Sequence, residues 1–253
     1  MKKIYKVLAW IRRICDLGNF NFLFPSRLSF FFLKHIEPHL YLDRWSSLPL
    51  NGQSRRLQTI LGITDFWKPD VVIETGTYLG SSTPFFASIS RKETYTIEIS
   101  YRYFRLAKKR FMNAYPHLNI KAILGDSKEV LPEILKKINP LQESVLAYLD
   151  AHWYKAIPTM NELEALIQWG GQWIAIIDDF EVPGDTGYSF DVYGQLSIGM
   201  SMIPKSENFT VFLPIVPSSL ETGARRGTGY LVSSAVISTY GADCFEGLLK
   251  NGN

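Results

Sequence analysis

The stretch "VVIETGTYLGSS" (residues 71–82) decides how this chain is expected to fold. Its first residues are apolar and predict a short buried strand at about residues 71–75. Gly76 and Gly80 follow, and glycines directly after a strand allow the backbone to turn and to approach a ligand closely. The stretch therefore predicts a strand followed by a ligand-binding turn.

Strands and helices are predicted to alternate after this turn, which is typical of a parallel sheet with helices on both faces. The pattern predicts a Rossmann-like, doubly wound α/β fold, in which a seven-stranded, mostly parallel sheet carries an antiparallel edge. Ser81 or Ser82 and Ser127 are expected to cap helices. The further strands are expected at residues 93–99, 119–126, 144–150, 172–179, 209–216 and 227–235, and the helices at 81–90, 101–115, 127–138 and 159–169.

Length and composition set broad limits. The chain has 253 residues, of which 46% are hydrophobic and 20% charged, as in ordinary globular proteins. This length suits one sizeable domain with an appendage, so we expect an N-terminal helical extension at residues 1–54 and the main domain at 55–253. The net charge of +3 is too weak to argue for nucleic acid, and two distant cysteines favour a reducing, cytoplasmic setting.

The N-terminal residues form a distinct, basic segment. Apolar residues recur at helical spacing in residues 1–14, and five lysines and arginines precede the first acid, Asp16. One interpretation is peripheral contact of residues 1–35 with an anionic membrane, at its inner face. The other is a helical cap that packs on the main domain or on a second subunit, so homo-oligomerisation is left open.

Each of the five predicted parallel strands ends in an acidic residue. The carboxyl ends of such strands share one edge of the sheet, where ligands bind. A single acid of this kind is commonly a helix cap, but acids at five successive strands favour a shared site. These residues are Glu74, Glu98, Asp126, Asp150, Asp178 and Asp179.

The first three of these positions lie in motifs that resemble those of class I S-adenosylmethionine-dependent methyltransferases. "ETGTYLG" lacks the Gly-x-Gly-x-x-Gly pattern of dinucleotide sites but resembles the first motif of this family, and "YTIEIS" and "ILGDS" resemble the second and third. The resemblance covers about residues 55–235 and implies that Glu98 binds the ribose hydroxyls and Asp126 the adenine amine. The implied cofactor-binding residues are Glu74, Gly76, Thr77, Tyr78, Gly80, Ser81, Glu98, Asp126 and Ser127.

The last three acids form a second group. Asp150, Asp178 and Asp179 are expected to lie close in space without a Lys partner, so their mutual repulsion would favour a divalent cation such as Mg²⁺ or Mn²⁺. Their positions resemble the ligands of metal-dependent O-methyltransferases that act on catechols and sugars. In catechol-type enzymes a catalytic Lys occupies the position of Trp153, so the resemblance favours Asp150 or His152 as the base over Lys155, two residues further on.

These features predict an S-adenosylmethionine-dependent, Mg-assisted O-methyltransferase that acts on a hydroxyl of a sugar, a glycan or another small polar molecule. Two alternatives are a cephalosporin-hydroxylase-like enzyme of the same fold and a non-catalytic binding or assembly protein. The acceptor pocket is expected to include Tyr188, Asp191 and Tyr193, while Arg225 and Arg226 either face an anionic group or lie in solvent.

Overall fold

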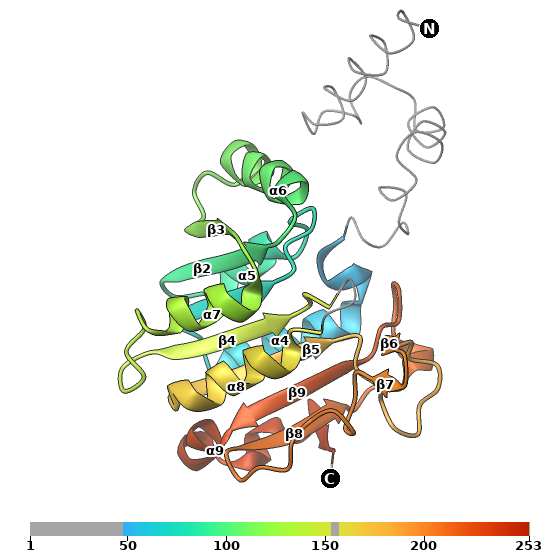
Figure 1. The fold of residues 1–253 in the computed structure, drawn as a ribbon. Coiled ribbons are helices and arrows are strands. Elements are labelled where there is room, and N and C mark those ends of the chain that lie inside the picture. Colours follow the sequence, from blue (N-terminus) through green and yellow to red (C-terminus); the bar gives the residue numbers. More distant parts are fainter. Residues whose placement is uncertain (1–47, 153–156, 253) are drawn as a thin grey trace, which may run out of the picture.

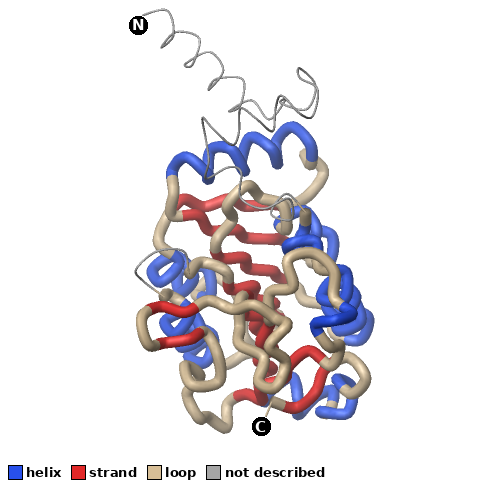
Figure 2. Tube along the Cα trace, turned by 90° about the vertical axis from the view of Figure 1, so that its right-hand side faces the viewer, coloured by secondary structure: helices blue, strands red, loops and turns tan. Residues whose placement is uncertain are grey.

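The computed structural model of the protein describes residues 48–152 and 157–252. Its centre is an eight-stranded sheet with the strand order β10-β8-β9-β5-β4-β1-β2-β3 (Figure 1). Helices cover both faces of this sheet, as Figure 2 shows from the side. The Rossmann-like architecture is confirmed, and the expected number of seven strands is corrected to eight.

The parallel half of the sheet agrees with the expected strands. It consists of β1 (Val71–Thr75), β2 (Glu93–Glu98), β3 (Ile120–Leu124), β4 (Ser144–Leu149) and β5 (Gln172–Asp178). Neighbouring strands in this half pair in parallel. The chain reverses order at β1, because β2 and β3 lie on one side of it and β4 and β5 on the other, and such a reversal creates a crevice for ligands.

The other half of the sheet is where the expected pattern needs correction. It contains β8 (Phe209–Pro214), β9 (Thr228–Ser233) and β10 (Leu249–Asn251). β9 runs antiparallel inside the sheet, between β5 and β8, and β10 forms the antiparallel outer edge. The expectation missed β10 because this strand has three residues, too few to show a hydrophobic period.

Two hydrophobic cores lie on opposite faces of the sheet, because successive strand residues point to opposite sides. Helices α7 (Ser127–Leu135) and α8 (Thr159–Trp169) pack on one face. The other face is covered by α5 (Thr83–Ile89), α4 (Ser54–Phe66) and α9 (Ser234–Tyr240), of which the last two were not predicted.

Helix α6 (Tyr101–Ala114) packs on β2 and β3, and both views place it at the end of the sheet (Figures 1 and 2). Ala107 and Phe111 are its buried residues.

The helix caps differ from the expected ones. Asp126, not Ser127, is the N-cap of α7, because its carboxylate accepts the Lys128 N–H at 3.0 Å from an extended backbone position. Ser82 occupies the N-cap position of α5 without a capping bond, and its hydroxyl instead accepts the Leu50 N–H at 2.9 Å.

A long polar loop follows β5, as expected from the sequence. It carries a hairpin of β6 (Val192–Tyr193) and β7 (Leu196–Ser197). Three single turns of 3₁₀-helix lie elsewhere, at Pro49–Gly52, Ser218–Leu220 and Ala242–Phe245.

The described part of the expected N-terminal extension, residues 48–54, contacts the main domain, since Leu50 is buried. The helix and the membrane contact predicted for residues 1–35 lie outside the described residues. Among the described helices, none combines the length and the apolar character that crossing a bilayer would require.

Candidate active site

The glycine turn after β1 touches the end of β4. Gly76 has φ +80°, and a Cβ atom on it would lie 2.1 Å from the Asp150 carbonyl oxygen. Gly80 has φ +68°, and a Cβ there would lie 2.5 Å from a ring carbon of Phe111. Since side chains fit at neither position, the turn needs glycine to pack this closely. It thereby fixes the predicted cofactor turn beside Asp150.

Glu98 holds this turn in place from the end of β2. One carboxylate oxygen accepts the Tyr78 N–H at 2.7 Å and the other the Ser100 N–H at 2.8 Å. Tyr78 has φ +49°, a backbone conformation that residues other than glycine rarely adopt. Burial raises the pKa of Glu98 although these N–H groups oppose the shift. The turn is therefore built around this carboxylate.

Glu74 lies inside the protein at the end of β1. One of its oxygens accepts the hydroxyls of Thr83 at 2.5 Å and Thr96 at 2.6 Å. The Thr77 hydroxyl lies 2.5 Å from that of Thr96 and continues the network. Burial raises the pKa of Glu74 to about 7, so near neutral pH this group is charged in part of the molecules only.

The remaining residues expected to bind the cofactor also have partners within the chain. Asp126 caps α7, as described above. Arg110 donates to the Leu79 carbonyl at 3.2 Å and to the Ser81 hydroxyl at 3.3 Å, so α6 supports the turn. Ser127 is buried.

Asp150, His152 and Asp179 come together at the ends of β4 and β5. One ligand atom from each lies within 4.8 Å of the others. His152 Nε2 lies 3.2 Å from Asp179 Oδ2 and 3.8 Å from Asp150 Oδ1. The imidazole is fully buried, and among the described residues its Nδ1 has no hydrogen-bond partner. Burial, with Asp178 and Asp179 nearby, raises the pKa of Asp150 well above its ordinary range.

Asp178 is occupied by other partners. Arg56 Nη1 lies 2.6 Å from its Oδ1, and the Tyr148 hydroxyl donates to its Oδ2 at 2.6 Å. Burial disfavours the charge on Arg56, but Asp178, together with nearby Tyr148, Tyr230 and Asp179, outweighs this and raises the pKa of the guanidinium. No lysine partner was expected for the three acids, but an arginine from α4, which was not foreseen, lies against one of them.

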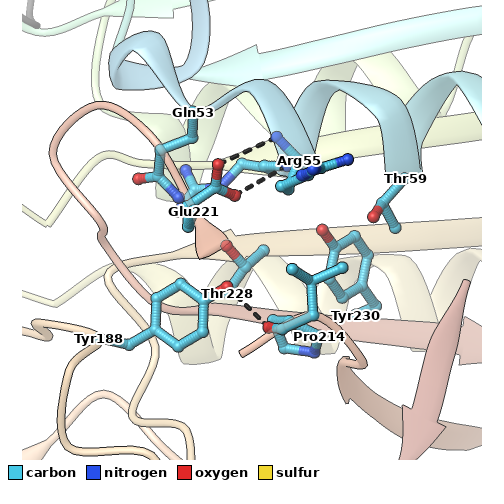
Figure 3. A pocket seen from close by; sticks show the side chains of 10 residues that line it. Gln53, Arg55, Thr59, Tyr188, Pro214, Glu221, Thr228 and Tyr230 are labelled. Atoms are coloured by element: carbon cyan, nitrogen blue, oxygen red, sulfur yellow. Dashed lines mark hydrogen bonds between the residues drawn. The ribbon is translucent and has the colours of Figure 1, made fainter. Parts of the chain in front are cut away.

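The start of α4 fixes the position of Arg56. Glu221 accepts the backbone N–H groups of Arg55 and Arg56, each at 2.9 Å, and so caps this helix from a distant loop. Figure 3 shows Glu221 in this role, in a pocket that Tyr188, Tyr230 and Thr228 also line.

Asp179 has an arginine partner as well. The Nε of Arg226 donates to Asp179 Oδ1, and its Nη2 donates to Asp191. Burial opposes ionisation of Asp179, but hydrogen bonds from His152 and Arg226 prevail and lower its pKa to about 2. Asp179 also has φ +56°, a strained conformation for an aspartate. Arg226 thus pairs with two acids of the chain itself and does not simply lie in solvent, while contact with an anionic group of the acceptor stays a prediction.

The residues expected to form the acceptor pocket have contacts in different parts of the structure. The Tyr193 hydroxyl donates to Asp191 at 3.3 Å, and the Tyr193 ring lies 6.5 Å from that of His152. Tyr188 donates instead to the Val216 carbonyl at 3.0 Å, away from this group. Trp153 and Lys155 lie outside the described residues.

One buried acid was missed from the sequence. Glu162 in α8 is fully buried, and neither carboxylate oxygen has a hydrogen-bond partner among the described residues. Burial raises its pKa to about 7, and the nearby hydroxyls of Ser127 and Thr75 offset part of this rise without reaching hydrogen-bonding geometry. Nothing in the pattern "TMNELEALIQW" distinguishes this acid from the exposed Glu164.

A comparison with protein families gives one match, to rhamnosyl O-methyltransferase/CmcI, over residues 45–189. This span is more than half of the chain and includes all six strand-end acids. The chain belongs to this family. It is a class I S-adenosylmethionine-dependent methyltransferase, as its motifs predicted, and its general activity is O-methylation.

Solved structures share the fold at low sequence identity. The cofactor-bound protein Rv0187 from MTB is 14% identical, with a TM-score of 0.52 over 83% of this chain and 97% of that one. A protein of Klebsiella pneumoniae, provisionally classed as an O-methyltransferase, is 17% identical, with a TM-score of 0.51 over 71% of this chain and 78% of that one. No curated protein sequence matches the chain.

Proposed function

We propose that this methyltransferase transfers the methyl group of S-adenosylmethionine to a hydroxyl of a sugar or another small polar acceptor, with help from a divalent cation. The observation that carries the proposal is the convergence of Asp150, His152 and Asp179 within 4.8 Å. This group lies directly beside the glycine turn, since Gly76 touches the backbone of Asp150. Acceptor and cofactor would thus meet at one edge of the sheet.

The donor set fits a divalent cation. Two carboxylates suit Mg²⁺ or Mn²⁺, and the imidazole nitrogen favours Mn²⁺ over Mg²⁺. The proposed ligands are Asp150, His152 and Asp179, in place of the set with Asp178 expected from the sequence, because Asp178 is held by Arg56 and Tyr148. A bound cation would lower the pKa of the acceptor hydroxyl.

Asp150 is the base we propose. Its side chain is 22% exposed whereas that of His152 is fully buried, so an acceptor can reach Asp150 more easily. As the acceptor oxygen takes the methyl group that S-adenosylmethionine would supply, S-adenosylhomocysteine would leave and the hydroxyl proton would pass to Asp150.

Glu98 and Asp126 are the proposed contacts to the ribose and the adenine. The carboxylate of Glu98 already shapes the turn, so its replacement should weaken cofactor binding both directly and through the turn. Calorimetric titration of the wild type and of Glu98→Ala with S-adenosylmethionine tests this part. Equal affinities would exclude Glu98 from the cofactor site.

Methyl transfer is tested with a panel of rhamnose-containing and hexose-containing acceptors. We expect S-adenosylhomocysteine and a product heavier by one methylene, and at least a hundredfold loss in Asp179→Asn. Asp65→Asn, an exposed acid of α4, is the matched control and should keep full activity. Full activity in excess chelator would reject the role of the cation. Methylated product formed in an assay that contains no sugar or polyol would reject the proposed class of acceptor.

A further inference from the structure

Positive charge is concentrated in one folded segment of the chain. Between Glu98 and Asp126 there is no acidic residue, whereas lysines and arginines occur at six positions. The whole chain has a net charge of only +3, so the remainder of the protein is net negative. Five of the six lie on α6, at Arg102, Arg105, Lys108, Lys109 and Arg110, and the sixth is Lys121 on β3.

Four exposed residues of α6 form a narrow stripe along the helix. Tyr101, Arg105, Lys108 and Met112 are spaced by four, three and four residues, so their side chains lie on one face. All four are exposed, with Tyr101 at 62% and Met112 at 67%. Within the stripe the Arg105 guanidinium lies 5.7 Å from the centre of the Tyr101 ring. Two cations are therefore flanked by an aromatic and an apolar side chain.

Two of the other cations of this segment are engaged elsewhere. Arg110 supports the glycine turn, and Lys121 pairs with Glu93. Two further apolar side chains, Ile99 and Leu124, are exposed at 60% and 43% at the ends of the paired strands β2 and β3, just before α6 begins in the case of Ile99. Neighbouring exposed apolar side chains of this kind mark interaction surfaces.

We propose that this stripe, formed by Tyr101, Arg105, Lys108 and Met112, is a docking surface for an anionic lipid membrane. Cations beside an aromatic and an apolar side chain match the phosphate and interfacial layers of a bilayer. Nucleic acid would use the cations but would leave Met112 and Ile99 exposed to water. The lipid surface accounts for both kinds of side chain.

The stripe begins at the edge of the sheet that carries the site. Tyr101 is the third residue after Glu98, so the stripe begins close to this carboxylate in the chain. Tyr103, whose ring lies 4.7 Å from that of Tyr78 in the glycine turn, is on the opposite face of α6. A membrane bound by the stripe would therefore lie about one helix diameter, roughly 10 Å, from the cofactor turn. This arrangement would suit an acceptor held at a lipid surface, an extension that rests on the proposed function, whereas the docking surface does not.

The first test measures whether α6 itself meets the lipid. A nitroxide label is placed by Met112→Cys in the full chain, with both native cysteines changed by Cys15→Ser and Cys244→Ser. The control label replaces Leu141, which is 92% exposed in the loop before β4, two strands away from β2 in the sheet. With vesicles of phosphatidylcholine and phosphatidylglycerol, we expect immersion of the label at position 112 and none at 141. An aqueous signal at 112 on vesicles that carry the protein would overturn the proposal.

The second test removes the charges. Arg105→Gln with Lys108→Gln should weaken binding to phosphatidylglycerol vesicles at least about tenfold, and added salt should weaken wild-type binding as well. Lys136→Gln with Lys137→Gln, two exposed lysines after α7, is the matched control. Unchanged binding in the first double variant, equal binding to neutral vesicles, or binding of duplex RNA but not of vesicles would each reject the anionic lipid surface.

Discussion

The two halves of the strand-end edge treat their carboxylates differently. At the ends of β1, β2 and β3, neutral groups satisfy the acids: threonine hydroxyls bind Glu74, and backbone N–H groups bind Glu98 and Asp126. At the end of β5, arginines pair with Asp178 and Asp179. Neutral partners allow the pKa of a buried acid to rise, whereas a guanidinium keeps an acid charged.

This difference assigns different roles to the two groups. A turn built from neutral contacts can exchange them for the hydroxyls and the amine of a cofactor at little electrostatic cost. In the second group, which contains Asp150, Asp178 and Asp179, the guanidinium groups of Arg56 and Arg226 offset two of the three negative charges. A cation entering that group must then compete with a resident guanidinium, and Arg226 is the competitor at Asp179.

The largest effect is expected from Arg56→Met. It leaves the fully buried Asp178 without its positive partner, which typically costs about 3–5 kcal/mol of unfolding free energy. Urea denaturation at neutral pH measures this loss. Arg55→Met, on the exposed side of the same helix turn, is the control and should change stability by less than about 0.5 kcal/mol. Equal losses in the two variants would mean that the pair does not compensate the burial of Asp178.

The pH dependence of Glu74→Gln tests the neutral half of the comparison. The folded-state pKa of Glu74 is raised from 4.5 to about 7, so the folded protein binds the extra proton and wild-type stability should fall as pH rises from about 4.5 to 7. Gln keeps an acceptor oxygen for the threonines and removes the charge. We expect it to gain up to roughly 3 kcal/mol over the wild type at pH 8, at 1.36 kcal/mol per pKa unit, and almost nothing at pH 4.

Denaturation of both proteins at pH 4, 6 and 8 measures this gain. A difference that does not change with pH would show that Glu74 keeps an ordinary pKa in the fold.

Arg226→Gln tests whether this arginine competes with a cation for Asp179. Removing a positive charge next to Asp179 should strengthen Mn²⁺ binding about tenfold, since a repulsion of about 1.4 kcal/mol corresponds to that factor. Electron paramagnetic resonance of free Mn²⁺ measures the affinity without any acceptor. Arg225→Gln is the neighbouring control, because Arg225 donates to the Glu221 carbonyl and not to the acids. Weaker Mn²⁺ binding in Arg226→Gln would show that Arg226 orients Asp179 for the cation and does not compete with it.

The sequence predicted the strands and their terminal acids better than it predicted the partners of those acids. β1 to β5 and their terminal acids follow from local apolar runs, because a buried parallel strand is a continuous signal of five to seven residues. The arginine partners could not be predicted, since they depend on tertiary contacts. Glu221 caps α4 across 165 residues, and Arg56 also donates to Tyr148 and to the Arg226 carbonyl, so contacts distant in the sequence bring it to Asp178. The expectation about the partners of the three carboxylates was incomplete for that reason, whereas the bound metal itself stays a prediction.

Asp126 gives the smallest effect and separates a structural role from a binding role. Its carboxylate caps α7, and losing the cap in Asp126→Ala should cost about 1 kcal/mol of unfolding free energy. Asparagine caps a helix nearly as well as aspartate, so Asp126→Asn should retain stability within a few tenths of a kcal/mol. If the negative charge also binds the adenine amine, both variants should bind S-adenosylmethionine more weakly in calorimetry. Wild-type affinity in Asp126→Asn would assign this acid to the cap alone and leave Glu98 as the carboxylate that recognises the cofactor.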